Sequence, residues 1–165
     1  MHGFILKGAV AVAAIVIVSA LAVWPAAASA MRGEIAISGV TSTLDPGSTN
    51  CVSQGPFVLT CESTGFLTGF AGTLTGSSST DSSTQLNCKT GRYHGHGVET
   101  FTGSLAGAGS GTLTWQLQTS GTISDDCSAL TSFEGRGIVV AGTGGLAGLH
   151  GAITFDATSY VGSLQ

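Results

Sequence analysis

The feature that most constrains the fold is a short segment that occurs three times, in which a glycine turn leads into an alternating strand. The C-terminal copy reads Leu-Ala-Gly-Leu-His-Gly-Ala-Ile-Thr at residues 146–154, and a copy with the same spacing stands at 67–75. A looser copy with one extra residue stands at 105–114. Glycine adopts tight-turn conformations easily and costs about 1 kcal/mol relative to alanine inside a helix. The repeats therefore predict short strands joined by tight turns.

Composition supports this interpretation. Nearly half of the residues from 31 onward are glycine, serine or threonine. Such a composition also suits a flexible linker, but the apolar residues here are periodic. In 112–118, for example, Leu113, Trp115 and Leu117 alternate with threonine and glutamine. That alternation predicts a strand with one buried and one solvated face.

Similar patterns predict a series of short strands and no helix after residue 30. The aspartate–proline–glycine turn at 45–47 falls in an expected loop over 41–54. The all-polar run 77–83 is expected to be an exposed, mobile loop, and 120–129 a further loop. We expect an all-β fold, an antiparallel β-barrel of about eight strands formed by one domain, residues 31–165. The expected strands cover 34–40, 57–62, 67–76, 84–89, 98–104, 112–118, 131–141, 149–156 and 159–164.

The N-terminus predicts export. Lys7 precedes an apolar run over 8–24, Pro25 ends that run, and Ala28 and Ala30 supply small residues before a cleavage point. This arrangement is typical of a signal peptide over residues 1–30. An uncleaved anchor is the alternative, because a spanning helix needs only about 20 apolar residues. We expect cleavage after Ala30, a secreted, extracellular or cell-surface protein, and no stable membrane insertion afterwards.

Four cysteines follow residue 30, namely Cys51, Cys61, Cys88 and Cys127. An even number in an exported chain indicates two disulfides. A zinc site is the rival, although zinc clusters usually contain closely spaced cysteine pairs. Three pairings are possible. We favour Cys51–Cys61 with Cys88–Cys127, because these pairs join neighbouring segments without crossing.

Charge excludes two classes of partner. Nine acidic residues outnumber five basic ones, which gives a net charge of −4. Nucleic-acid binding needs a basic surface, so we expect no nucleic-acid partner. An anionic membrane surface is disfavoured for the same reason.

The segment 142–155, Gly-Thr-Gly-Gly-Leu-Ala-Gly-Leu-His-Gly-Ala-Ile-Thr-Phe, resembles the closing motif of the allene oxide cyclase and dirigent barrel superfamily. It is more specifically similar to secreted bacterial proteins of uncharacterised function with an allene-oxide-cyclase-barrel-like domain. The motif covers about fifteen residues. The resemblance implies an eight-stranded antiparallel barrel with a hydrophobic interior. No position matches the substrate-contacting residues of the plant cyclases, so it implies the fold and not the catalysis.

The strongest metal-like pattern is His94-Gly95-His96 with Glu99 three residues later, which is reminiscent of the cupin metal box. Strand geometry directs Glu99 away from both histidines. A metal needs three or four convergent ligands, which His150 or Asp156 could complete only if the fold brought them near. We expect no metal and no cofactor, and we interpret the histidines as surface residues in a glycine-flanked turn.

Acidic residues offer weaker alternatives. Asp125-Asp126 supplies only part of the six or more oxygens that calcium prefers, so it is interpreted as a solvated loop. Paired carboxylates of the glycosidase type stay open, because pairing across a sheet is invisible in sequence. Glu62, Glu99 and Glu134 lie on or beside expected strands, and one of them can point into the barrel.

Two functions remain open. The favoured one is a non-enzymatic exported barrel that binds a small apolar ligand or acts as a surface interaction module. The alternative is a barrel isomerase or cyclase acting on a small hydrophobic substrate. A carboxylate inside a lined pocket would favour the enzyme, whereas side chains such as Trp115 filling the interior would exclude both ligand binding and catalysis. The specific ligand and the oligomeric state are left open. The residues expected to line a cavity are Phe101, Leu113, Trp115, Leu117 and Phe155.

Overall fold

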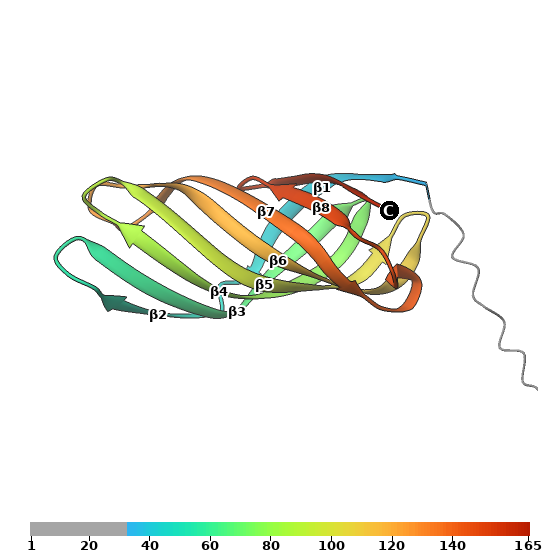
Figure 1. Cartoon of the computed structure of the whole chain (residues 1–165), viewed down its shortest axis with the longest axis horizontal. Helices are drawn as coiled ribbons and strands as arrows, with labels where there is room; N and C mark the ends of the chain where they lie inside the picture. Colours follow the sequence, from blue (N-terminus) through green and yellow to red (C-terminus); the bar gives the residue numbers. More distant parts are fainter. Residues whose placement is uncertain (1–32) are drawn as a thin grey trace, which may run out of the picture. The chain divides into compact units, whose positions relative to one another are not determined.

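The computed structural model describes residues 33–165, and the predicted signal peptide, residues 1–30, lies outside the described residues. The described part of the chain forms nine strands, one short 3-10 turn and no α-helix, as the sequence predicted. The elements, labelled in Figure 1, are β1 (Ile35–Asp45), β2 (Ser48–Ser53), β3 (Val58–Gly72), β4 (Leu74–Asn87), β5 (Arg92–Leu105), β6 (Gly109–Ile123), β7 (Leu130–Gly142), η1 (Gly144–Leu146), β8 (Gly151–Phe155) and β9 (Ser159–Leu164).

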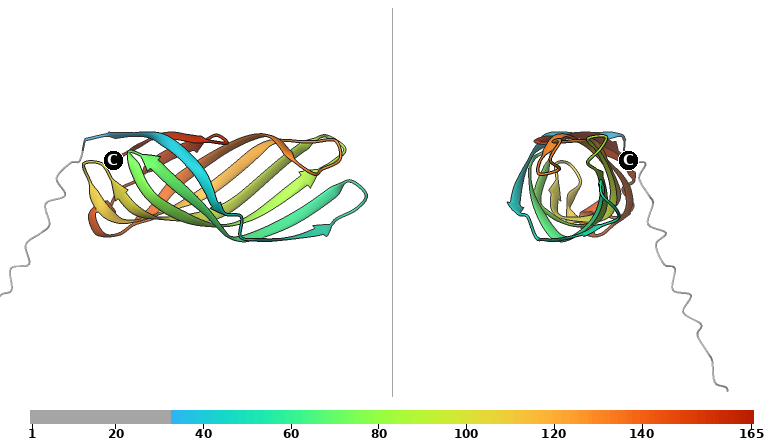
Figure 2. Two further views of the ribbon diagram at one scale, coloured as in Figure 1. Left: turned by 180° about the vertical axis from the view of Figure 1, so that it is seen from behind. Right: turned by 90° about the vertical axis from the view of Figure 1, so that its left-hand side faces the viewer.

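All strand pairs are antiparallel, and the sheet closes on itself. The order is β1-β9-β8-β7-β6-β5-β4-β3-β2, with a further pairing between β1 and β3 that completes a ring of eight strands. The end-on view in Figure 2 shows this ring. Closure leaves few free strand edges, which suits a chain with few charges to protect them. The predicted all-β barrel of about eight strands is confirmed.

β1 and β2 act as one interrupted strand along β3. β1 pairs with the C-terminal half of β3, and β2 pairs with the N-terminal half, Leu59–Thr64. The interruption is the predicted turn, in which the Gly47 N–H donates to Oδ1 of Asp45 over 2.8 Å. The expectation of a loop over 41–54 was therefore wrong, because the turn interrupts strand pairing only briefly.

The serine-rich segment 77–83 is also not a loop. It lies inside β4, where it pairs with β3 on one side and β5 on the other. The segment has no apolar side chain to signal a buried face, yet Ser78 and Thr80 are buried. Both point into the barrel, where their small hydroxyl groups lie beside the carboxyl of Glu99 on β5. Pairing with β3 and β5 satisfies the backbone hydrogen-bonding groups on both edges of this segment. The strand therefore forms although its sequence shows no apolar pattern.

The three glycine segments lie at one end of the barrel, called here the glycine end. They form the β3–β4, β5–β6 and β7–β8 connections, visible at the right of Figure 1. Backbone bonds join them, from Ala106 N–H to the Thr73 carbonyl (3.0 Å) and from Thr143 N–H to the Thr112 carbonyl (2.9 Å). The first copy, expected to be one strand over 67–76, instead turns between Gly72 and Leu74.

The hydrophobic core fills the glycine end. Trp115 is fully buried and lies against β7, where a Cβ at Gly137 would come within 2.6 Å of its ring. Only glycine at that position lets the indole lie flat on the strand, a device that shapes curved sheets. Phe70 packs edge-on against Phe101 and Trp115 at centroid distances of 5.4 and 6.1 Å. The other fully buried large side chains are Tyr160, Leu74, Leu105, Leu113, Leu146, Ile153 and Leu164.

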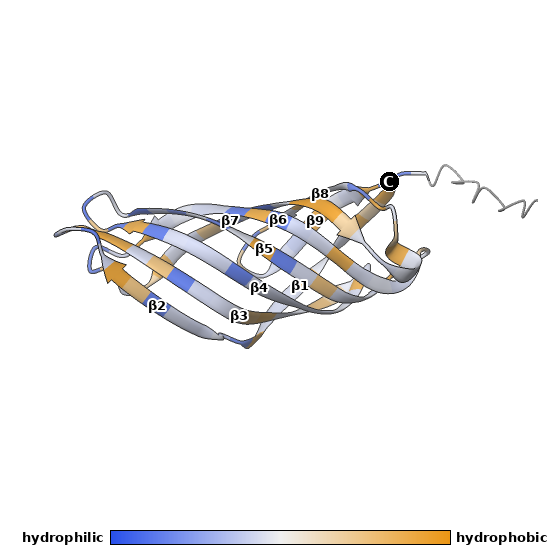
Figure 3. Cartoon of the chain, turned by 60° about the horizontal axis from the view of Figure 1, so that its bottom comes forward, coloured by the Kyte–Doolittle hydropathy of each residue, from blue (hydrophilic) through white to orange (hydrophobic). Residues whose placement is uncertain are grey.

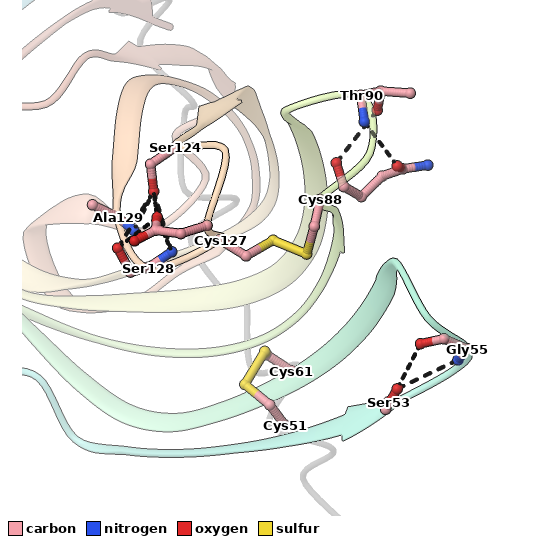
Figure 4. The surroundings of a disulfide bond; sticks show 12 residues. Cys51, Ser53, Gly55, Cys61, Cys88, Thr90, Ser124, Cys127, Ser128 and Ala129 are labelled. Atoms are coloured by element: carbon pink, nitrogen blue, oxygen red, sulfur yellow. Dashed lines mark hydrogen bonds between the residues drawn. A yellow bond between two sulfur atoms is a disulfide. The ribbon is translucent and has the colours of Figure 1, made fainter.

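The opposite end, called here the disulfide end, carries both disulfides (Figure 4). Cys51 of β2 pairs with Cys61, its direct neighbour in β3. Cys88, just after β4, pairs with Cys127 in the β6–β7 connection. The favoured pairing is confirmed, and the described residues contain no free cysteine. The expected loop over 120–129 is shorter than predicted, because β6 continues to Ile123.

The outer surface carries little charge. Most of the strand surface has intermediate hydropathy, with apolar residues interspersed along it (Figure 3). Hydroxyl pairs cross between neighbouring strands, as between Thr100 and Thr114 (3.3 Å) and between Ser48 and Thr64 (2.8 Å). Serine and threonine thus replace charged groups as the polar cover of this barrel.

Candidate functional site

The half of the barrel toward the disulfide end encloses a cavity of about 470 Å³. Its wall combines aromatic and aliphatic side chains with serine and threonine hydroxyls. Phe70 belongs both to this wall and to the aromatic cluster of the glycine end, so it separates the filled half from the open half. The interior is therefore filled at one end and hollow at the other.

Part of the cavity wall lies where two strands lose a neighbour. β9 pairs with β1 only over Ile35–Val40, and β8 pairs with β7 only over Gly135–Val139. Beyond those limits, residues 41–43 of β1 and 130–133 of β7 line the cavity, together with Phe155 at the end of β8 and residues 156–157 of the β8–β9 connection. The short β8 and β9 thus leave these stretches of β1 and β7 without a second strand neighbour beside the cavity.

Glu99 lies in the wall of this cavity and is only 5 % exposed. Its carboxyl oxygens each accept a hydrogen bond, Oε1 from the Ser78 hydroxyl of β4 and Oε2 from Nε1 of Trp115 of β6 over 2.9 Å. The strand register places these partners on either side, because Glu99 pairs with Thr80 and Trp115. The carboxyl is therefore fixed in position by two neighbouring strands.

Burial raises the pKa of Glu99 above its ordinary value, while the hydrogen bonds from Ser78 and Trp115 act in the opposite direction. Desolvation disfavours the charged form of a buried carboxyl, and here it is the dominant effect. A carboxyl of this kind can keep its proton at a pH where an exposed glutamate has lost it. Glu99 then offers the cavity an O–H donor as well as acceptor lone pairs.

Tyr93 is the second polar group of interest in the cavity wall. It lies on β5, on the same face as Glu99, and is 4 % exposed. Its hydroxyl is buried and is the one buried side-chain polar atom of the described residues without a hydrogen-bond partner. Burial, with a smaller contribution from the charge of Glu134, raises the pKa of Tyr93 to about 12. The group is therefore a neutral hydroxyl at ordinary pH.

The structure divides the predicted cavity-lining residues into two sets. Leu117 and Phe155 line the cavity. Phe101, Leu113 and Trp115 point inward as predicted but are fully buried in the core of the glycine end. Trp115 nevertheless reaches the site through its bond to Glu99. Sequence reasoning missed four aromatic lining residues, Phe66, Phe70, Tyr93 and Phe133.

Of the three glutamates singled out from the sequence, Glu99 alone points inward. Glu62 is exposed and accepts a hydrogen bond from the Ser83 hydroxyl at 2.7 Å. Glu134 is exposed on the outer face of β7. Strand parity separated the two faces of β5 correctly, but only the register with β4 and β6 shows which face is enclosed.

The metal-like patterns do not converge. His94 and His96 are exposed and lie inside strand β5 rather than in a turn, on the face opposite to the buried Glu99, and His96 is also among the residues that line the cavity. Within residues 33–165, no group of three or more His, Cys, Asp or Glu side chains is placed to hold a metal ion. Asp126 forms a local turn instead, and hydrogen bonds from Ser124 and Ser128 lower its pKa to about 2.

Comparison with known proteins shows a likeness in fold. One solved structure, a protein of unknown function from the DUF3224 family of Shewanella oneidensis MR-1, has a TM-score of 0.55 and 18% sequence identity. The match covers 80% of this chain and 96% of that one. No protein-family model matches the chain, and no curated protein matches it in sequence. At this identity the likeness shows a shared β-rich fold alone. The resemblance to allene oxide cyclases and dirigent proteins stays a prediction.

Proposed function

We propose that this protein is an exported β-barrel that binds a small, largely apolar molecule inside its open half. The observation that carries the proposal is the cavity of about 470 Å³ that is lined by aromatic side chains and contains the fixed carboxyl of Glu99. Ligand sites are typically cavities of about 300–1,000 Å³ with mostly apolar walls and a few placed polar groups. Trp115, which would have excluded binding had it filled the whole interior, occupies the core beside the cavity.

Export is part of the proposal. Two disulfides suit an oxidising compartment, since cytosolic thiols are normally kept reduced. The proposed cleavage after Ala30 would release residues 31–165. Within the described residues, no helix is long and apolar enough to cross a membrane.

An isomerase or cyclase acting on a small hydrophobic substrate is the second candidate. A buried carboxyl with a raised pKa in a largely apolar cavity is a common general acid, and Glu99 has that setting. Binding remains the first choice because both oxygens of Glu99 are already engaged by Ser78 and Trp115. Two hydrogen bonds hold the carboxyl in one position. A binding site needs such a fixed polar group and does not need it to transfer a proton.

The cavity can be tested by filling it. Thr119 of β6 lines the cavity, whereas Gln118, the residue before it on the same strand, is exposed on the outer face. We expect calorimetric titration to show dodecanol binding to the wild type and to the matched control Gln118→Phe. Thr119→Phe should lose at least about tenfold in affinity, because the ring occupies the ligand's volume.

Two results would contradict this proposal. Binding that Thr119→Phe leaves intact while Gln118→Phe abolishes it would move the ligand to the outer surface. An absence of binding by the wild type across neutral apolar alcohols and terpenoids would leave an interaction module. Turnover of an added substrate that is lost in Glu99→Gln would favour the enzyme instead.

A further inference from the structure

The hydroxyl of Tyr93 poses a physical problem that the proposed function does not solve. It is buried in the cavity wall and has no hydrogen-bond partner among the described residues. Leaving a buried hydroxyl unpaired costs about 1–3 kcal/mol. The contrast is Tyr160, whose equally buried hydroxyl accepts the Leu74 N–H at 2.8 Å. A ligand atom that accepts from or donates to Tyr93 would remove this cost.

Tyr93 and Glu99 stand in line along one strand. They are six positions apart on β5, which corresponds to about 20 Å between their backbones. The two positions between them on the same face of β5 are Gly95 and Gly97, which carry no side chain. Thr84 and Thr119, from the neighbouring strands, close in over Gly95. A molecule that contacts both polar groups is therefore elongated and lies along β5.

The charges around the cavity restrict the ends of that molecule. Of the described residues that line the cavity, none is lysine or arginine. The acidic groups are Glu99 and the exposed Asp156, and the histidine is His96, whose side chain is exposed. A buried carboxylate or phosphate without a partner cation is strongly disfavoured. Anionic lipids and free fatty acids are thus poor ligands, although their apolar chains would fit.

We infer that the ligand is an uncharged, elongated molecule with a hydrogen-bonding group near each end, one held by Glu99 and the other by Tyr93. This inference rests on the proposed function. A long-chain diol or hydroxy ketone has this chemistry. Tyr93 is then a ligand-binding residue, and Ser78 and Trp115 are positioning residues that orient the carboxyl of Glu99. The apolar middle of the molecule packs against Phe70, Leu117 and Phe155.

Three ligands with the same carbon chain test this inference by calorimetric titration of the full chain: dodecanol, dodecanediol with a hydroxyl at each end, and dodecanoate. We expect the diol to bind the wild type about tenfold more tightly than the alcohol, since a second hydrogen bond forms in a buried site. Dodecanoate should bind at least about tenfold more weakly than the alcohol. In Tyr93→Phe, the advantage of the diol should disappear while the affinity for the alcohol is kept.

Tyr93→Phe should fold normally, because the hydroxyl that it removes has no partner to lose. Tyr160→Phe is the matched control: it removes a partnered hydroxyl outside the cavity, so its melting temperature should fall while the preference for the diol persists. Three outcomes would overturn this inference and leave the proposed function standing. They are equal affinity for the alcohol and the diol, a diol advantage that survives Tyr93→Phe, and tight binding of dodecanoate. If none of the three ligands binds the wild type, both the inference and the proposed function are wrong.

Discussion

At the scale of single residues, the decisive group is Glu99, and sequence reasoning came close to it. Alternation along β5 placed Glu99 on the face opposite to His94 and His96, which the structure bears out. The sequence could not show which face is enclosed, because that depends on the register with β4 and β6. Tyr93 was missed for a related reason. A tyrosine near a strand end has no sequence signal of burial or of an unpaired hydroxyl.

Glu99 should make the stability of the protein depend on pH. Because burial raises its pKa above the ordinary value in the folded chain, the folded state keeps this proton to a higher pH than the unfolded state does. The contribution to the unfolding free energy is therefore full below the unfolded pKa and is lost as the pH rises through the folded pKa. Glu99→Gln should remove this decline, measured by urea denaturation from mildly acidic to mildly alkaline pH.

Glu62→Gln is the control, because Glu62 is an exposed glutamate that also accepts a serine hydroxyl. It should keep the decline seen in the wild type. If the unfolding free energy of the wild type and of Glu99→Gln depends on pH in the same way, then Glu99 does not keep its proton to a higher pH in the folded state.

At the scale of strands, alternation succeeded where apolar residues mark one face and failed where they are absent. β6 was predicted from Leu113, Trp115 and Leu117, all of which are buried. The serine-rich part of β4 was assigned to a loop, although its backbone is paired on both edges. In β4 the inward positions are small and polar because they face Glu99 and the cavity. The failure therefore coincides with the candidate site.

The two disulfides should differ in their contribution to stability. Cys51 and Cys61 are separated by 10 positions, whereas Cys88 and Cys127 are separated by 39. A cross-link that closes a longer loop restricts the unfolded chain more, which gives about 3 kcal/mol for the first and about 4 kcal/mol for the second. Denaturation of the paired variants C51S/C61S and C88S/C127S should show the larger loss in the second. An equal or reversed order would argue that the native loop at the disulfide end is strained or that the unfolded chain keeps structure.

At the scale of the whole molecule, the sequence predicted a closed antiparallel barrel from the number of strands and the repeated glycine turns. It did not predict that the interior is filled at the glycine end and hollow at the disulfide end. That division arises from long-range packing, in which Phe70, Trp115 and Phe155 come from three different strands. It also depends on the short β8 and β9, which leave part of β1 and β7 without a second strand neighbour beside the cavity.

The central claim is that the open half of this barrel is a ligand site with Glu99 in its wall. A crystal structure of the protein grown with dodecanol tests it most directly. We expect the alcohol inside the cavity, with its hydroxyl within hydrogen-bond distance of the Glu99 carboxyl and its chain against Phe70 and Phe155. Alcohol bound only to the outer surface, or a cavity closed by its own side chains such as Phe133, would contradict the claim.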